Sequence, residues 1–261
     1  MNSIKLGVCG ALGKMGSRIL ELAALDPELR VVLALERTAH PGVGTKAGGM
    51  EVTCDREAIK NVDGLIDFSS VEGTLEHLAS CVKHKKALVI GTTGFNEGQK
   101  KEIFEAAKRV PVVFSPNMSI GVNLLFELVR QAASSLPPDY QVSMREAHHA
   151  HKKDAPSGTA KFLADIVRDE RKLADVPVQS IREGEIIGDH EVVFESPQDT
   201  IRISHSAKTR DIFVLGALKA LKFAVRKKQG LFSMADVLRD MSDRKNNEQR
   251  SSTPIQDRET E

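Results

Sequence analysis

The segment from Glu146 to Thr159 carries a dense set of side chains able to move protons. It holds three of the eight histidines and two lysines within six residues. Imidazole and amine groups act as general acids near neutral pH when their surroundings adjust their pKa. Ser157-Gly158-Thr159 precedes a predicted helix, whose first N–H groups can hold a carboxylate. The segment is typical of a loop that protonates and holds a small acidic substrate.

Two other interpretations of this segment stay open. His148, His149 and His151 can in principle bind a metal ion. However, neighbours on an extended segment point to opposite faces, and no acidic or cysteine partner has ligand spacing. The segment can also be a solvated basic loop without a role. The helix start after Pro156 favours catalysis and carboxylate binding, and we expect no metal site.

A second chemical signal is the glycine turn from Gly10 to Gly16, which follows an apolar run. Glycines let the backbone turn tightly and approach a pyrophosphate, and the next helix offers free N–H groups at its start. The spacing is G-x-x-G-x-x-G, because Leu12 replaces the middle glycine of the usual motif. The turn predicts dinucleotide binding.

The second predicted strand ends in Glu36, followed by Arg37. A carboxylate at this place accepts hydrogen bonds from the adenosine ribose of NAD. Arg37 can instead pair with the 2′-phosphate of NADP, with help from Lys14. Alternatively, the two residues only cap a surface strand. We expect NADH, NADPH or both as cofactor.

Alternating strands and helices must position these motifs. Nearly continuous apolar strands indicate burial on both faces and therefore a parallel sheet. We expect an α/β fold with a Rossmann-type doubly wound parallel sheet, whose ligands bind at the carboxyl ends of the strands. The expected strands are 4–9, 29–36, 65–68, 87–90 and 112–114, and the expected helices are 14–25, 71–85 and 97–109. The strand ends are small or polar: Gly10–Gly13, Glu36–Arg37, Phe68–Ser70, Gly91–Gly94 and Ser115–Met118.

After Ser119 the pattern changes to a second α+β unit. It comprises predicted helices at 122–135 and from Thr159, and predicted strands at 140–146, 191–194 and 200–205. An apolar helix at 213–225 and an apolar segment at 230–234 follow. Residues 243–261 have almost no apolar content, so we expect a disordered tail.

Composition narrows the function classes. The chain has 37 basic and 36 acidic residues, no Trp and one Tyr. These numbers favour neither a nucleic-acid partner nor a membrane surface. No apolar run can span a bilayer and no signal peptide is evident. Cys9, Cys54 and Cys81 lack metal-motif spacing and are typical of buried thiols in a reducing compartment. We expect a cytoplasmic protein.

The chain resembles the 4-hydroxy-tetrahydrodipicolinate reductase (dihydrodipicolinate reductase) family. The histidine segment is the most specific match, and the matches reach from Gly10 to about Met241. They comprise Gly10–Gly16, Ile66–Ser69, Gly91–Phe95, Asn117–Asn123, Glu146–Thr159, Arg182–Gly184, Gly188–His190 and Gly230–Met234.

The resemblance implies a role for each matching residue. It implies His148 as acid/base, Lys152 as proton donor, and a small dicarboxylate substrate bound by His149, Gly158 and Thr159. It implies that the nicotinamide cofactor is lined by Gly10, Ala11, Leu12, Gly13, Lys14, Met15, Glu36, Arg37, Gly91, Thr92, Thr93, Ser115, Pro116, Asn117 and Met118. Ala150 stands where many members carry Arg, which alters the charge of the loop.

The resemblance also implies the domain organisation. Residues 1–118, completed by 213–242, form the dinucleotide-binding domain. Residues 119–212 form an α+β substrate-binding and oligomerisation domain, and the expected assembly is a homotetramer. Hinges near Ser119 and Asp211 are expected to close the domains over the cleft.

Two rival functions stay open. A related two-domain dehydrogenase acting on another small dicarboxylate would share the first domain without needing the histidine segment. A non-catalytic NAD(P) sensor would keep the glycine turn and Glu36. It would have no reason to keep His148 and Lys152 together, so their joint presence favours the reductase.

Overall fold

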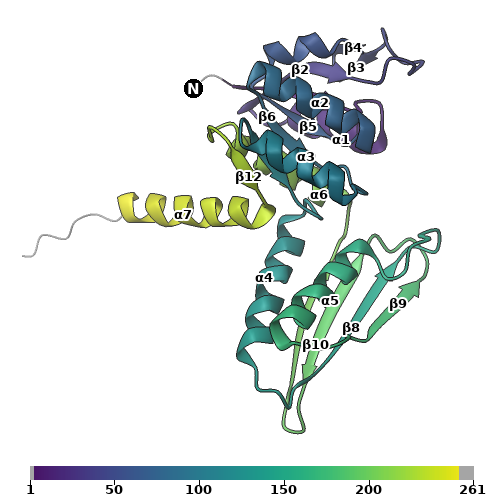
Figure 1. Ribbon diagram of the computed structural model, residues 1–261, viewed down its shortest axis with the longest axis vertical. Helices are drawn as coiled ribbons and strands as arrows, with labels where there is room; N and C mark the ends of the chain where they lie inside the picture. Colours follow the sequence, from purple (N-terminus) through teal and green to yellow (C-terminus); the bar gives the residue numbers. More distant parts are fainter. Residues whose placement is uncertain (1–2, 253–261) are drawn as a thin grey trace, which may run out of the picture.

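The computed structural model describes residues 3–252. An eight-stranded sheet with its helices forms one half of the molecule, and a four-stranded sheet with two helices forms the other (Figure 1). The chain passes from the first half to the second through helix α4 (Ile120–Ser135) and returns through the segment before helix α6 (Asp211–Ala224). The α/β class and the second α+β unit are confirmed.

The larger sheet has the order β12-β7-β6-β5-β1-β2-β4-β3. All of its pairs are parallel except β3–β4. The strand order reverses direction beside β1, which is where ligands bind in sheets of this kind. Its strands are β1 (Ile4–Cys9), β2 (Leu29–Leu35), β3 (Lys46–Ala47), β4 (Met50–Thr53), β5 (Gly64–Asp67), β6 (Ala87–Ile90), β7 (Pro111–Phe114) and β12 (Gly230–Phe232).

Both faces of this sheet are buried, as the continuous apolar strands predicted. Leu6, Val8 and Ile66 belong to a core cluster with α6. Leu65 and Leu88 point to the other face, into a second cluster. The covering helices are α1 (Lys14–Ala23), α2 (Val71–His84) and α3 (Glu97–Ala107), together with α6 and the short 3-10 helix η1 (Arg56–Asn61).

The smaller sheet has the order β11-β10-β8-β9. It consists of β8 (Gln141–His148), β9 (Val178–Arg182), β10 (Asp189–Glu195) and β11 (Thr200–Ser206). Helices α4 and α5 (Gly158–Arg171) cover one face, where Met144, Val192 and Phe194 are buried. The alternate positions, such as Ser143 and Ser204, point to the opposite face and are exposed.

The C-terminal end differs from the expectation. Helix α7 (Met234–Ser252) projects away from the rest of the molecule (Figure 1). Residues 243–252 belong to this helix, whereas we expected them to be disordered. The first turns of this helix are anchored in the core by Met234 and Val237, and charge pairs such as Arg244 with Asp240 at 2.9 Å support its polar continuation. The remaining predicted tail, 253–261, lies outside the described residues.

The expected strands are all present, but β3, β4, β9 and β12 were not predicted. β12 pairs with β7, and α6 packs against β5, β6 and β7. Residues after 211 therefore complete the larger sheet. No helix among the described residues has the length and apolar character that crossing a membrane needs.

Candidate active site

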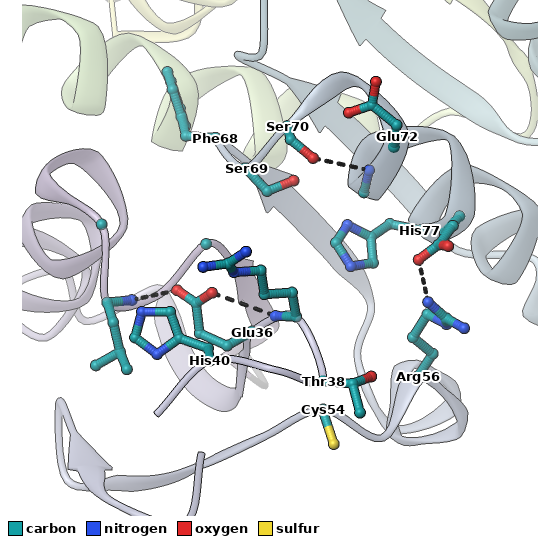
Figure 2. A pocket seen from close by; sticks show the side chains of 16 residues that line it. Glu36, Thr38, His40, Cys54, Arg56, Phe68, Ser69, Ser70, Glu72 and His77 are labelled. Carbon is teal, nitrogen blue, oxygen red and sulfur yellow. Dashed lines mark hydrogen bonds and ion pairs between the residues drawn. The ribbon is translucent and has the colours of Figure 1, made fainter. Parts of the chain in front are cut away.

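A cavity of about 830 Å³ lies above the carboxyl ends of β1, β2 and β5 (Figure 2). Five of the predicted cofactor residues line it: Gly10, Leu12, Gly13, Glu36 and Arg37. The turn after β1 and the end of β2 thus meet at one cavity. Its size and position fit an elongated ligand that crosses the point where the strand order reverses.

The glycine turn is built from backbone positions that other residues cannot occupy. Gly10 has a φ of 71°, in the left-handed region. A Cβ atom on Gly16 would lie 2.0 Å from the carbonyl oxygen of Gly10. Gly13 is the N-cap of α1 and gives it no side-chain cap. The helix therefore packs close to the turn, and its first N–H groups stay available to an anion.

Glu36 ties the end of β2 to this turn. Its Oε1 accepts a hydrogen bond from the Leu12 amide at 2.9 Å, and its Oε2 accepts one from the Arg37 amide at 3.3 Å (Figure 2). The carboxylate is thus fixed at the cavity wall with Arg37 beside it. An anionic and a cationic group therefore stand together where the sequence predicts binding of the adenosine ribose.

The remaining predicted cofactor residues do not line this cavity. Ala11 is fully buried, and Lys14 and Met15 begin α1. Gly91, Thr92 and Thr93 follow β6, and Ser115, Pro116, Asn117 and Met118 follow β7, next along the sheet from β5. Parallel pairing places these segments at the same sheet edge as the cavity.

Sequence reasoning missed part of the cavity wall. His77 on α2 lines it, and its Nδ1 lies 2.7 Å from Oδ2 of the fully buried Asp67. The other carboxylate oxygen of Asp67 accepts hydrogen bonds from the amide and hydroxyl of Ser69. Arg56, from η1, faces Glu76 of α2 (Figure 2). These residues come from elements that only the fold brings together.

A second polar cluster lies at the end of β8, in the smaller sheet. Glu146 is 1% exposed and His148 is 8% exposed. The Nδ1 atom of His148 lies 2.5 Å from Oε2 of Glu146. The other carboxylate oxygen accepts hydrogen bonds from Arg182 at 2.7 Å and from the Ser157 amide at 3.3 Å. The His190 ring packs edge-on against His148, with centroids 5.2 Å apart.

Burial and hydrogen bonding set the charges in this cluster. Burial alone would raise the pKa of Glu146, but hydrogen bonds from Arg182, Ser180 and His148 outweigh it, and the pKa is lowered. Burial lowers the pKa of His148 although Glu146 opposes this effect. Burial lowers the pKa of His190 to about 4. The cluster therefore combines an ionised carboxylate with imidazoles that resist protonation.

Lys152 and the start of α5 lie in the same loop region. The Nζ of Lys152 is 2.8 Å from a carboxylate oxygen of Asp154. Ser157 caps α5 by accepting a hydrogen bond from the Ala160 amide. Thr159, on the first turn of α5, accepts a hydrogen bond through its hydroxyl from the Asn117 side chain at 3.1 Å. The segment after β7 therefore touches the predicted substrate-binding helix start.

The geometry of the histidine segment differs from the one that a metal site with three histidine ligands would need. His148 turns toward Glu146 and His190, while the rings of His149 and His151 lie 6.2 Å apart. Within residues 3–252, two other groups have ligand-type atoms within 4.8 Å of one another: Glu146, His148 and His190, and separately Cys9, Asp67 and His77. Arg182 already pairs with Glu146, and burial raises the pKa of the Cys9 thiol, which disfavours its metal-binding form.

Comparison with known families gives two matches that together span most of the chain. The model described as dihydrodipicolinate reductase, N-terminus, matches residues 4–118. The model described as dihydrodipicolinate reductase, C-terminus, matches residues 121–238.

Curated relatives agree with these matches. A 4-hydroxy-tetrahydrodipicolinate reductase of Nitrosomonas eutropha is 40% identical over 91% of this chain and 99% of its own length. One from Anaeromyxobacter dehalogenans is 39% identical over 90% of this chain and 97% of its own length. Among solved structures, dipicolinate-bound dihydrodipicolinate reductase from Paenisporosarcina sp. TG-14 has a TM-score of 0.75 at 22% identity, covering 88% of this chain and 97% of that one.

Proposed function

Because this chain belongs to the dihydrodipicolinate reductase family, it reduces 4-hydroxy-tetrahydrodipicolinate with a nicotinamide cofactor in lysine biosynthesis, and we propose that His148 and Lys152 handle the protons of that reaction. The motif resemblance is confirmed by the family matches. The observation that carries the proposed roles is the buried cluster of His148, Glu146 and Arg182 beside the start of α5.

The first domain fits a dinucleotide. The uncapped start of α1 and the glycine turn form a cradle that a Cβ atom at Gly16 would close. We assign the pyrophosphate to Gly10–Gly13 and the adenosine ribose to Glu36 and Arg37. The predicted contacts of Gly91–Thr93 and Ser115–Met118 with the nicotinamide half are supported by their place at the same sheet edge. The bound cofactor supplies hydride to the conjugated imine of the substrate.

The second domain fits a small dicarboxylate. The Gly158 and Thr159 amides at the start of α5 can hold one carboxylate, and His149 and Lys152 can approach the other. Lys152 is held in the loop by Asp154 at 2.8 Å, an ion pair that a substrate carboxylate can exchange. These contacts hold the reacting carbon against the cofactor side of the cleft.

Proton delivery completes the reduction. As hydride adds to C4 of the conjugated cyclic imine, electron density moves toward the ring nitrogen and C3, and a proton must then be delivered to complete the reduction. Lys152 is the donor in this proposal, and His148 is the acid/base that adjoins it. General acid catalysis of this kind contributes about 10²–10⁴-fold to a rate.

We further propose the division at 1–118 with 213–242 against 119–212, and assembly into a homotetramer in the cytoplasm. The face of the smaller sheet away from α4 and α5 supports this assembly, because neither helix covers it. A shallow cavity of about 260 Å³ on that face is lined by residues such as Arg145, Glu183 and Glu191. Light scattering after gel filtration tests the tetramer.

A coupled assay tests the function. The preceding synthase makes the unstable substrate in place from pyruvate and aspartate semialdehyde, and absorbance follows the oxidation of NADH and NADPH. We expect turnover that disappears when the synthase is omitted. A folded protein that binds either cofactor but turns over neither would point instead to a cofactor sensor or to another dehydrogenase.

A further inference from the structure

Glu146 has more polar contacts than its place in the proposed reaction requires. It lies on β8 two residues before His148, so both side chains point to the same face of the sheet. Each of its carboxylate oxygens is used: one by the His148 ring, the other by Arg182 and by the Ser157 amide. At 1% exposure, this carboxylate has exchanged water for these partners.

The charge state of Glu146 fixes the direction of its hydrogen bond with His148. The pKa of Glu146 is lowered, since hydrogen bonds from its neighbours outweigh burial, so the group is ionised near neutral pH. An ionised carboxylate only accepts hydrogen bonds. Nδ1 of His148 must therefore carry the proton in this contact. In the neutral ring, Nε2 is then the free acceptor.

The backbone beside His148 keeps Nε2 open. Gly188 lies next to this ring, and a Cβ atom there would stand 3.1 Å from Nε2. A larger side chain at this position would crowd the nitrogen that the hydrogen bond leaves free. The two observations come from different elements, the end of β8 and the segment before β10, and both concern the same atom.

We propose that Glu146 is a positioning residue, which holds His148 with its proton on Nδ1 and its Nε2 free for the substrate. Arg182 and the Ser157 amide hold the carboxylate in turn, so the helix start that binds substrate and the acid/base residue share one anchor. This inference rests on the proposed function, because it takes His148 to be the acid/base group.

The charged and titratable groups that face His148 predict the direction in which its pKa, and with it the pH profile of the rate, moves when one of them is removed. They are Glu146 on the same strand, Arg182 at the end of β9, His190 on β10 and Lys152 in the loop. Only Glu146 among them favours the protonated ring. Its removal lowers the pKa of His148 further. A rate that needs neutral His148, with its Nε2 free, then holds to lower pH before it falls in acid.

The first test needs no substrate. Nitrogen-15 NMR of histidine-labelled protein distinguishes a protonated ring nitrogen from a free one, and His148→Gln identifies the signals. We expect His148 with protonated Nδ1 and free Nε2 near pH 7.5. The opposite tautomer, or a rapidly exchanging mixture, would overturn the proposal.

The second test compares Glu146→Gln with Glu127→Gln, a change at an exposed glutamate on α4. For Glu146→Gln we expect kcat to fall on the order of 10²-fold and KM for NADPH to stay near the wild-type value. We also expect the fall in rate with decreasing pH to start at lower pH than in wild type. A purely structural role would lower thermal stability and kcat without moving the pH profile, and that result would also overturn the proposal.

The design separates two kinds of failure. If His148→Ala retains full reductase turnover, the proposed catalytic role of His148 fails, whatever the NMR spectrum shows. If His148→Ala abolishes turnover but the tautomer is wrong, or Glu146→Gln leaves the pH profile in place, only the positioning role of Glu146 fails.

Discussion

The side chain of Asn117 donates a hydrogen bond to the hydroxyl of Thr159 at 3.1 Å, across 42 residues of sequence. Asn117 follows the last strand before α4, and Thr159 begins α5 in the second domain. The oxygen of the same Asn117 side-chain amide is also fixed, because it accepts a hydrogen bond from the Ser119 backbone amide. The contact joins a predicted cofactor residue to a predicted substrate residue.

The contact between Asn117 and Thr159 predicts energetic coupling between them. In a double-mutant cycle of Asn117→Ala and Thr159→Val, we expect a coupling free energy of about 1 kcal/mol in kcat/KM for the dicarboxylate. The cycle of Asn117→Ala with Thr200→Val, at an exposed strand end, is the control and should be additive. Additivity in both cycles would mean that the hydrogen bond does not link the two sites.

Replacement of Lys152 separates proton donation from cofactor binding. We expect Lys152→Ala to reduce kcat by about 10²–10⁴-fold, because the loop loses its donor, while the Kd for NADPH, measured by fluorescence, stays unchanged. Lys161→Ala, at an exposed position on α5, is the matched control. Equal loss of NADPH binding in Lys152→Ala would contradict this division of labour.

Arg37 and Glu36 predict opposite effects on cofactor choice. Arg37→Ala should weaken NADPH binding by about tenfold to a hundredfold, the range for one lost charge-assisted hydrogen bond, and should leave NADH binding closer to wild type. Arg30→Ala, at the exposed start of the same strand, is the control. Calorimetric titration with both cofactors gives the ratio. A ratio unchanged by Arg37→Ala would place the 2′-phosphate elsewhere, for example near Arg56.

The success of sequence reasoning differs between local and long-range features. The glycine turn, each strand end and the histidine segment are each a single contiguous stretch of sequence. Their chemistry could therefore be predicted from the sequence alone. Asp67 with His77, and Glu146 with Arg182, pair through the fold, and no spacing reveals them. The helical course of residues 243–252 was missed because polarity alone was taken as disorder. Charge pairs within the helix, such as Arg244 with Asp240, help to stabilise this polar part of α7, which continues from turns buried in the core at Met234 and Val237.

Protonation of His190 should limit stability in acid. Its Nε2 lies 3.2 Å from the Ser157 hydroxyl, and burial lowers its pKa from 6.5 to about 4. As pH falls below 6.5, His190 becomes protonated in the unfolded chain but stays neutral in the folded chain until about pH 4. The free energy of unfolding therefore decreases across this window, by up to about 3 kcal/mol.

Urea denaturation at several pH values measures this effect of His190. The change His190→Gln removes the titrating group while retaining a side chain able to bond Ser157. We therefore expect a shallower decrease in unfolding free energy between pH 6.5 and 4 than in wild type, whereas His151→Gln, at an exposed histidine, should follow the wild-type curve. Parallel curves for His190→Gln and wild type would show that His190 is protonated equally in both states. The acid sensitivity would then belong to another group, and His148 is the next candidate, since burial lowers its pKa and its contribution has the same sign as pH falls below about 6.5.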